Sequence, residues 1–334
     1  MTPKEKERLR IWGKGLSGDI EIRFLATQDT RSQALSKFCA DLARFAPKVR
    51  VLREEGEPHE VPAVWIGSGL RYHGVPLGTE LEPFLEALSN SDQGAACIPR
   101  SVRDGLAHIT VPAELRLYVS QQCHFCPVTA RQVIPLVRMN ESIRVTIVDC
   151  VLFPEMARSH TIRSVPTLLL DEQFRWTGAL QLEELVAVMA NRNPAKLSAA
   201  SLEGLLKDGR ASEVAEMMIA QQSIFPAFID LLSHEKLFIR LGAMVIMEEI
   251  SGRNPELAAQ VIDPLWERFP PAKDQVKGDI IYVLGESGNH EVVLRLEMIL
   301  AGSYNSEVKE AAKEALGKIH RKATPHDICG EPRR

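Results

Sequence analysis

The order of strand-like and helix-like segments repeats once within the first 192 residues, and this repeat constrains the fold more than any other feature. Apolar runs at residues 22–27 and 115–120 match at an offset of 93 residues, and runs at 61–66 and 165–170 match at an offset of 104. Each copy ends in an amphipathic helix. A repeat of about 100 residues indicates two copies of one domain, because solenoid units are only ~20–50 residues long.

Each copy is predicted to be mixed α/β, with glycine and proline marking a connector between the two. The first copy is expected to contain a strand at 20–27, a helix at 30–45, strands at 48–52 and 61–66, and a helix at 79–88. The second is expected to contain strands at 115–120, 143–149 and 167–170 and helices at 127–138, 154–160 and 181–191.

Strand-like runs disappear after residue 194, and a shorter period replaces the first. Ile239, Val276 and Val308 each begin the same apolar pattern, at spacings of 37 and 32 residues. Each pattern follows an apolar helix, expected at 225–232, 261–269 and 292–300. Helix pairs of this kind bury their apolar faces only by stacking, so the pattern predicts an α-solenoid that resembles HEAT-like repeats.

Composition narrows the possible partners and compartment. The 334 residues include 40 Lys and Arg against 44 Asp and Glu, and this formal charge of −4 gives no reason to expect nucleic acid or an anionic membrane as a partner. No apolar run reaches the ~18–20 residues that span a bilayer, and residues 1–8 lack the apolar core of a secretory signal. Six cysteines are too few for a disulfide scaffold. We therefore expect a cytoplasmic protein in which a close cysteine pair is catalytic or metal-binding.

Residues 123–127 (CHFCP) hold two cysteines at CxxC spacing, between a predicted strand and a predicted helix. Free N–H groups and the dipole at the start of a helix stabilise a thiolate. Cys123 lies nearer the open end and is the expected nucleophile. Cys126, one turn inside, is expected to resolve the mixed disulfide. Pro127 suits the beginning of a helix.

A zinc site and a structural disulfide are the alternatives. A zinc site needs about four ligands, and the remaining cysteines are scattered, at Cys39, Cys97, Cys150 and Cys329. A structural disulfide is rare in a reducing cytoplasm. The strand–CxxC–helix context therefore favours redox chemistry, with no metal and no cofactor expected. Cys150 is predicted to be either a small core residue or a third thiol that exchanges with the pair.

Residues 162–170 (IRSVPTLLL) lie about 40 residues downstream and begin a strand. They resemble the thioredoxin segment whose cis-proline packs beside the CxxC. We predict a cis bond between Val165 and Pro166; a trans proline at a strand start is the alternative. Val165 and Pro166, with His124 and Phe125, form the expected substrate-binding surface. His124 either favours the thiolate as a cation or is a neutral exposed spacer.

The first copy lacks the thiols, because Thr30 and Gln33 stand at the positions of the two cysteines. Its fold is nevertheless expected to be the same. Four segments together resemble the N-terminal domain of the alkyl hydroperoxide reductase F subunit, a tandem of two thioredoxin folds: residues 123–127, 148–153 (VDCVLF), 164–167 (SVPT) and, in the first copy, 74–80 (GVPLGTE). The resemblance covers residues 20–192. Archaeal-type protein disulfide oxidoreductases share this tandem architecture.

The resemblance implies an electron relay, in which a flavoprotein dithiol reduces the CxxC and the CxxC reduces a peroxiredoxin disulfide. In that family a glutamate of the inactive half approaches the active CxxC, and the matching residue here is Glu80. Thioredoxins usually bury an aspartate six residues before the first cysteine, where this chain has Leu117. Glu80 is therefore expected either to accept the proton of Cys126 or to tune Cys123. A glutamate that only complements the helix dipole is the alternative.

We thus expect an α/β plus all-α chain, with two tandem thioredoxin folds followed by a HEAT-like α-solenoid. The expected function is that of a thiol–disulfide oxidoreductase in cell redox homeostasis, which relays electrons from a separate flavoprotein or dithiol reductant to a protein disulfide such as that of a peroxiredoxin. The helical repeats stand in place of the family's flavin and nicotinamide domains and are expected to bind a protein partner. The alternative is a redox-sensitive scaffold in which the repeats carry the function. The expected domains are an inactive thioredoxin-like fold (1–92), a connector (93–112), an active fold (113–195), HEAT-like repeats (196–324) and a flexible tail (325–334).

Overall fold

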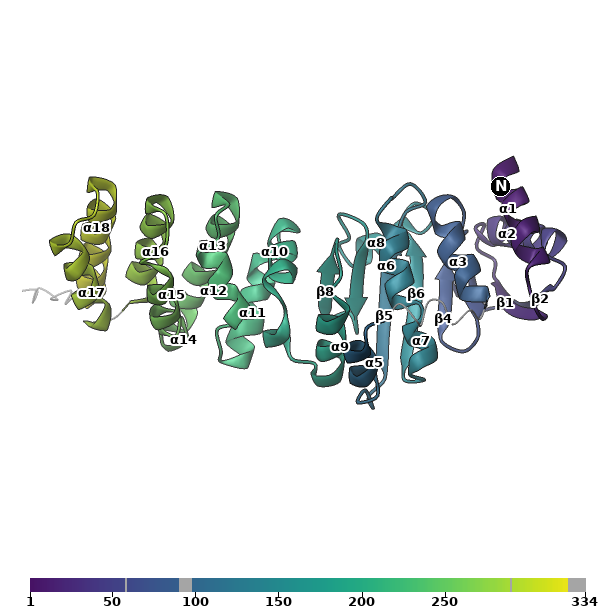
Figure 1. Cartoon of the computed structure of the whole chain (residues 1–334), viewed down its shortest axis with the longest axis horizontal. Helices are drawn as coiled ribbons and strands as arrows, with labels where there is room; N and C mark the ends of the chain where they lie inside the picture. Colours follow the sequence, from purple (N-terminus) through teal and green to yellow (C-terminus); the bar gives the residue numbers. More distant parts are fainter. Residues whose placement is uncertain (58, 90–97, 289, 324–334) are drawn as a thin grey trace, which may run out of the picture. The chain divides into compact units, whose positions relative to one another are not determined.

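The computed structural model describes residues 1–57, 59–89, 98–288 and 290–323. The chain divides into two compact units, Met1–Asn193 and Pro194–Arg334 (Figure 1). The tail predicted at 325–334, Cys97 and Cys329 lie outside the described residues. The domain boundaries expected within each unit stay predictions.

The first unit is built on one eight-stranded sheet, with strands in the order β2-β1-β3-β4-β6-β5-β7-β8. Its N-terminal half contains α1 (Pro3–Lys14), β1 (Ile20–Ala26), α2 (Ser32–Phe45), β2 (Val49–Glu55), β3 (Ala63–Ile66), β4 (Leu70–His73), the 3₁₀ helix η1 (Gly78–Glu80) and α3 (Leu81–Leu88). Its C-terminal half contains α5 (Arg100–Leu106), β5 (Ala113–Val119), α6 (Cys126–Val133), α7 (Leu136–Met139), β6 (Ile143–Asp149), α8 (Pro154–Ser159), β7 (Thr167–Leu170), β8 (Phe174–Thr177) and α9 (Leu182–Asn191).

The two halves pair their strands in the same way. In the first half β1 runs parallel to β2 and antiparallel to β3, which is antiparallel to β4. In the second half β5 has the same relations to β6 and β7, and β7 to β8. Parallel pairing of β4 with β6 joins the halves. The carboxyl ends of β4, β5 and β6 therefore meet at one edge of the sheet.

Helices α2, α3 and α6 cover one face of this sheet. Phe24, Val64 and Tyr72 lie opposite one another on neighbouring strands and are buried. The Phe84 ring of α3 makes edge-to-face contacts with Tyr72 and with Phe38 of α2, at ring-centroid distances of 5.2 and 5.5 Å. These contacts fix α3, and hence η1 before it, against the sheet.

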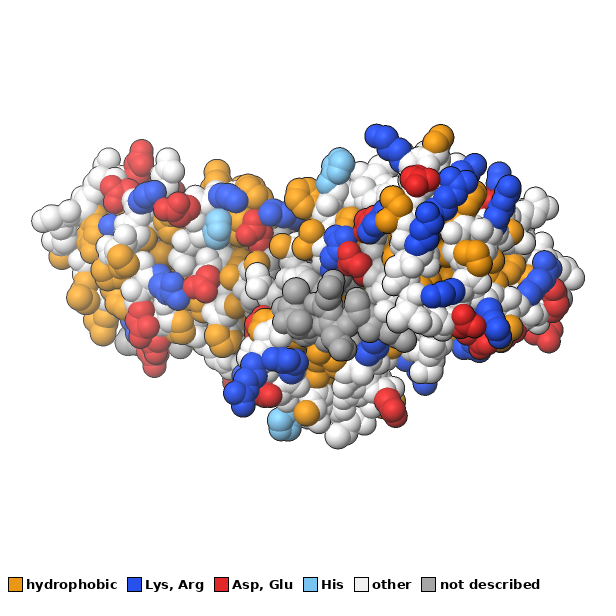
Figure 2. All heavy atoms as spheres, turned by 45° about the vertical axis from the view of Figure 1, so that its right-hand side comes forward, with side chains coloured by type: hydrophobic (Ala, Val, Ile, Leu, Met, Phe, Trp, Pro, Cys, Tyr) orange, Lys and Arg blue, Asp and Glu red, His pale blue; other side chains and the backbone are white. Residues whose placement is uncertain are grey.

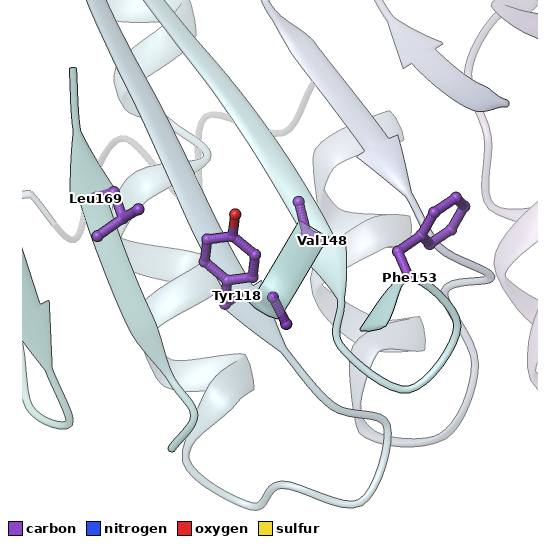
Figure 3. Packing of buried hydrophobic residues seen from close by; sticks show 5 residues of the cluster. Tyr118, Val148, Phe153 and Leu169 are labelled. Atoms are coloured by element: carbon purple, nitrogen blue, oxygen red, sulfur yellow. The ribbon is translucent and has the colours of Figure 1, made fainter. Parts of the chain in front are cut away.

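The other face is packed differently in the two halves. In the C-terminal half Tyr118, Val148 and Leu169 form a buried cluster with Phe153 and with Ala157 of α8 (Figure 3). In the N-terminal half the same face carries half-buried polar and aromatic side chains, among them Trp65 and Arg71.

Most expected elements form, with three differences. The helix expected at 127–138 is two helices, α6 and α7, because Pro135 lacks the N–H that a continuous helix needs. The four-residue strands β4 and β8 were not expected, since their runs are too short to show a period. Helix α1 was not expected either, although Thr2 and Glu5 form a capping box at its start.

The second unit is helical throughout its described residues. It contains η2 (Pro194–Lys196), α10 (Ala199–Lys207), α11 (Ala211–Gln221), α12 (Pro226–Leu232), α13 (Leu237–Arg253), α14 (Pro255–Ala259), α15 (Ile262–Arg268), α16 (Asp274–Ser287), α17 (His290–Ala301) and α18 (Ser306–Ala323). The six helices expected from the period lie at α12, α13 and α15–α18, and α16 packs closely on α18, where Gly285 faces Ala315. Helices α10, α11 and α14 were not expected. In the described parts of both units, no helix is both long and apolar enough to cross a membrane.

Candidate active site

Cys123 and Cys126 are joined by a disulfide at the carboxyl end of β5. Cys126 is the first residue of α6 and is fully buried, whereas Cys123 precedes the helix and is half-buried. The Cys126 backbone N–H donates to the Cys123 Sγ over 3.1 Å. This places Cys126 at the helix start and not a full turn inside, and it leaves Cys123 as the more accessible sulfur of the pair.

The segment with the predicted cis-proline lies beside this disulfide. The Val165–Pro166 peptide bond is cis, which confirms the prediction. The Cys123 Sγ lies 3.7 Å from the Val165 carbonyl oxygen. His124 and Phe125 are exposed, Phe125 at 74%, as a protein-binding surface would require. The structure therefore brings Cys123 together with Val165 and places His124 and Phe125 at the surface next to them.

A loop of the N-terminal half is tied to the loop that precedes the CxxC. Thr79 Oγ1 lies 3.0 Å from the Gln121 carbonyl oxygen and 3.1 Å from that of Cys123, and its backbone N–H donates to Gln121 over 3.3 Å. Gln121 Nε2 donates to the Val75 carbonyl oxygen over 2.8 Å. Gly78 has a φ of +60°, and a Cβ there would lie 2.8 Å from the Gln121 carbonyl oxygen, so the close approach of the loops requires glycine.

This loop carries Glu80, which is the next residue after Thr79 and is 3% exposed. Neither carboxylate oxygen has a hydrogen-bond partner among the described residues. Burial raises the pKa of Glu80 to about 7, and the negative charge of Asp149 also raises it, whereas Arg131 lowers it. A pKa near neutrality is what a group that exchanges protons at physiological pH needs. The helix-dipole alternative does not explain why both oxygens are buried without partners.

Asp149 is the residue that the sequence analysis did not include in the site. It ends β6, is 5% exposed, and accepts N–H bonds from Val151 and Gln121, at 2.9 and 3.4 Å. Burial raises its pKa, and these hydrogen bonds lower it. The signal that identifies Asp149 is topological: it ends a strand that is parallel to β5 and adjacent to it, and active-site groups collect where such strands end.

The other described cysteines, Cys39 and Cys150, form no disulfide. Burial raises the pKa of Cys150 and that of Cys39 to about 12, so both are thiols at neutral pH. Cys150 packs against the cluster of Tyr118 and Phe153, which favours the prediction of a core residue. Leu117, where thioredoxins usually have an aspartate, is fully buried on β5. Within the described ranges, no group of three or more His, Cys, Asp and Glu side chains is arranged to hold a metal.

Residues 113–190 match the family model described as a thioredoxin domain. The matched residues include both cysteines of the disulfide, so the second half of the α/β unit is similar to a thioredoxin domain. The first half of the unit lies outside the matched residues.

Curated relatives match a longer part of the chain than the family model does. A protein named NADH dehydrogenase from Bacillus subtilis (strain 168) is 25% identical over 191 residues, which are 56% of this chain and 37% of that protein. The alkyl hydroperoxide reductase F subunit of Pseudomonas aeruginosa is 24% identical over 230 residues, which are 66% of this chain and 44% of that protein. The chain thus spans about two fifths of the length of these relatives.

Two solved structures share the fold. A mutant of the alkyl hydroperoxide reductase F subunit of Enterococcus faecalis aligns with a TM-score of 0.50 at 21% identity, over 57% of this chain and 99% of that chain. A protein disulfide oxidoreductase from Aeropyrum pernix aligns with a TM-score of 0.51 at 13% identity, over 57% of this chain and 93% of that chain.

Proposed function

We propose that the chain is a protein thiol–disulfide oxidoreductase whose α/β unit is a tandem of two thioredoxin folds, the first without a CxxC. The observation that carries this proposal is the Cys123–Cys126 disulfide at a strand–helix junction beside the cis bond of Pro166. The identical strand pairing of the two halves supports the tandem. The similarity to the alkyl hydroperoxide reductase F subunit supports the redox chemistry.

The catalytic cycle needs the two thiols and one proton acceptor. In the reduced protein the Cys123 thiolate attacks a disulfide sulfur of the substrate, and one substrate thiolate leaves and takes a proton. Cys126 then loses its proton and attacks the Cys123 Sγ. This step re-forms the intramolecular disulfide and releases the second substrate thiol. Two electrons pass to the substrate, and an external dithiol must return them.

Glu80 is the proposed acceptor of the Cys126 proton. Its carboxylate is buried in the segment that Thr79 ties to the backbone of Cys123, and its pKa of about 7 lets it take up and release a proton near neutral pH. The backbone of Val165, with Pro166, His124 and Phe125, is the proposed surface for an extended substrate segment.

The proposed donor is a separate flavoprotein or dithiol reductant in the cytoplasm, and the proposed acceptor is a protein disulfide such as that of a peroxiredoxin. The relatives that are alkyl hydroperoxide reductase F subunits motivate both assignments. The second unit, which we propose to be HEAT-like, would select among protein partners.

Trapping tests the redox proposal. Cys126→Ser should hold a substrate protein as a mixed disulfide on Cys123, and Cys123→Ser should abolish the acceleration that the wild-type protein gives to the reduction of insulin by dithiothreitol. Cys150→Ser is the matched control, because it removes a free cysteine of the same unit and should retain turnover. The proposal is wrong if Cys123→Ser and the wild-type protein reduce insulin at the same rate.

A scaffold is the second candidate function, and an exposed apolar surface on the helical unit favours it. Leu237, Phe238, Leu241 and Val245 of α13 are 49–56% exposed. The same unit has a cavity of about 870 Å³, which is lined by Met244 of α13 and by residues of α16 and α18, including Tyr282. Figure 2 shows one face of the molecule, on which hydrophobic side chains gather over this unit. Exposed apolar surface of this extent commonly marks a protein-binding site.

The protein trapped by Cys126→Ser separates the two functions. If the repeats carry the function, Leu241→Glu should abolish the non-covalent binding of that protein, and Cys123→Ser should leave the binding intact. Binding that is lost with Cys123→Ser and unaffected by Leu241→Glu contradicts the scaffold.

A further inference from the structure

We propose that the sheet carries a binding site for a small oxyanion, the phosphate or carboxylate group of a small molecule. The site lies where β4 of the first half pairs with β6 of the second. The site lies on the face opposite α2 and α3, in a cavity of about 360 Å³. Arg71 of β4, Thr146 of β6 and Arg116 of β5 line it. No residue of the disulfide site lines this cavity, so the proposal is independent of the redox function.

Strand register builds the site. Arg23 lies opposite Trp65, Trp65 opposite Arg71, Arg71 opposite Thr146, and Thr146 opposite Arg116. Residues directly opposite each other on neighbouring strands point to the same face of a sheet. Arg71 and Arg116 therefore flank the Thr146 hydroxyl, with strand axes about 10 Å apart, which is two strand spacings.

Among the described residues, Arg71 has no ion-pair partner, unlike Arg23 and Arg116 on the same face. Arg23 has Glu54 at 3.6 Å, and Arg116 donates to Glu172 over 2.8 Å. Arg71 has no carboxylate within ion-pair distance among the described residues, and its buried Nε has no hydrogen-bond partner there.

The contact that Arg71 does make fixes its position. Its guanidinium lies 3.8 Å from the centroid of the Trp65 ring. Burial lowers the pKa of Arg71; the negative charges of Glu114 and Glu60 raise it, and the positive charges of Arg116 and Arg144 lower it, although an arginine keeps its proton at neutral pH. A half-buried cation with no carboxylate at ion-pair distance has lost part of its hydration without gaining a contacting counter-ion. A bound oxyanion would supply that counter-ion.

The chemistry of the lining defines the ligand. A guanidinium binds carboxylate or phosphate through two parallel N–H bonds, and a threonine hydroxyl adds a donor. The volume suits a small molecule rather than a peptide. The acidic residue of the lining is Glu60, which is exposed. Its carboxylate accepts the backbone N–H of Glu57 over 2.7 Å, which holds its charge at the rim of the cavity.

The test uses the full-length oxidised protein with inorganic phosphate and malonate as probes and chloride at equal ionic strength as the reference. Calorimetry should report saturable binding of at least one probe. The tryptophan fluorescence of the protein, to which Trp65 contributes, should change with the same saturation. Arg71→Met should weaken that binding at least tenfold, and Thr146→Val should weaken it less. Arg50→Met is the matched control, because Arg50 is an exposed arginine of β2 paired with Asp19, and its loss should leave binding unchanged.

The two probes also distinguish the sources of the ligand. Saturation by phosphate alone assigns the site to a phosphorylated molecule, and saturation by malonate alone assigns it to a carboxylic acid. The proposal fails if neither probe saturates, or if Arg71→Met binds as tightly as the wild-type protein. Thermal unfolding checks that Arg71→Met is folded; if it is not, Thr146→Val decides, and unchanged binding by that variant overturns the proposal.

Discussion

Replacement of Glu80 by glutamine should change how the stability of the α/β unit depends on pH. The carboxyl group has a pKa of about 7 in the folded protein against 4.5 as the reference value. A raised pKa means that the folded state holds the proton more tightly than the unfolded state. The wild-type unit therefore loses stability as the pH rises from 4.5 towards 7, and the loss is complete above 7. Glutamine does not titrate, so the α/β unit of Glu80→Gln does not lose this stability as the pH rises.

The magnitude follows from the shift of about 2.5 pKa units, since one unit corresponds to ~1.36 kcal/mol. The full effect is about 3 kcal/mol at high pH. Between pH 5 and pH 8, the free energy of unfolding of Glu80→Gln should rise relative to wild type by about 2.5 kcal/mol. Because Glu80 is 3% exposed, solvent screening reduces this figure little.

Urea denaturation at pH 5, 6, 7 and 8 measures the effect. A Trp266→Phe background confines tryptophan fluorescence to Trp12, Trp65 and Trp176, which all lie in the α/β unit. Glu141→Gln is the matched control, because this exposed carboxyl lies in the same unit and its loss should leave the pH dependence as in wild type. Identical pH profiles for Glu80→Gln and wild type would refute the argument that Glu80 carries a buried, raised-pKa carboxyl.

Three further perturbations test the packing around the site and the helical unit. Gly78→Ala should destabilise the α/β unit by about 1–2 kcal/mol in urea, because φ is +60° and the new Cβ meets the Gln121 carbonyl oxygen; no loss would contradict the close approach of the loops. Burial lowers the pKa of His73 to about 4, so the free energy of unfolding of wild type should fall by up to about 3 kcal/mol as the pH falls from 6.5 to 4. His73→Gln should make this fall smaller, and an equally large fall in the variant would be inconsistent with a neutral buried imidazole. Gly285→Ala should destabilise the helical unit alone, by about 1–3 kcal/mol, because its Cβ would lie 2.9 Å from that of Ala315; a shift in the α/β transition would contradict this.

Local patterns in the sequence predicted the elements that carry long apolar periods. The strands at β1, β5 and β6 and the helices at α2 and α9 were all expected close to their observed bounds. The cis bond before Pro166 was also predicted, because its segment resembles a known one. Strands β4 and β8 were not, since four residues show no period; each becomes a strand by pairing with the strand before it, β3 or β7. Tertiary pairing, not local propensity, makes such segments strands.

The candidate site was predicted only in part, for a related reason. The CxxC is local, so the sequence alone identified Cys123 and Cys126. The burial of Glu80 depends on contacts with residues about 40 positions away, such as that between Thr79 and Gln121, which no local pattern shows. Asp149 was missed because its significance depends on strand order.

Strand order also explains how the first half, which lacks the CxxC, reaches the disulfide site. Strand β5 offers no acid at the position where thioredoxins usually have an aspartate, because Leu117 stands there. Since β4, β5 and β6 are parallel neighbours, the loops that follow them leave the sheet at one edge. Glu80 and Cys123 lie in the segments that follow β4 and β5, and Asp149 is the last residue of β6. The thiols and the two buried acids thus come from three separate strand ends, and the end that supplies Glu80 belongs to the half without the CxxC. A half that had no function beyond filling the sheet would not need to bury an unpartnered carboxylate at that edge, where burial opposes folding above pH 4.5. The stability cost at Glu80 is therefore the main physical argument for the proposed contribution of the first half to thiol exchange.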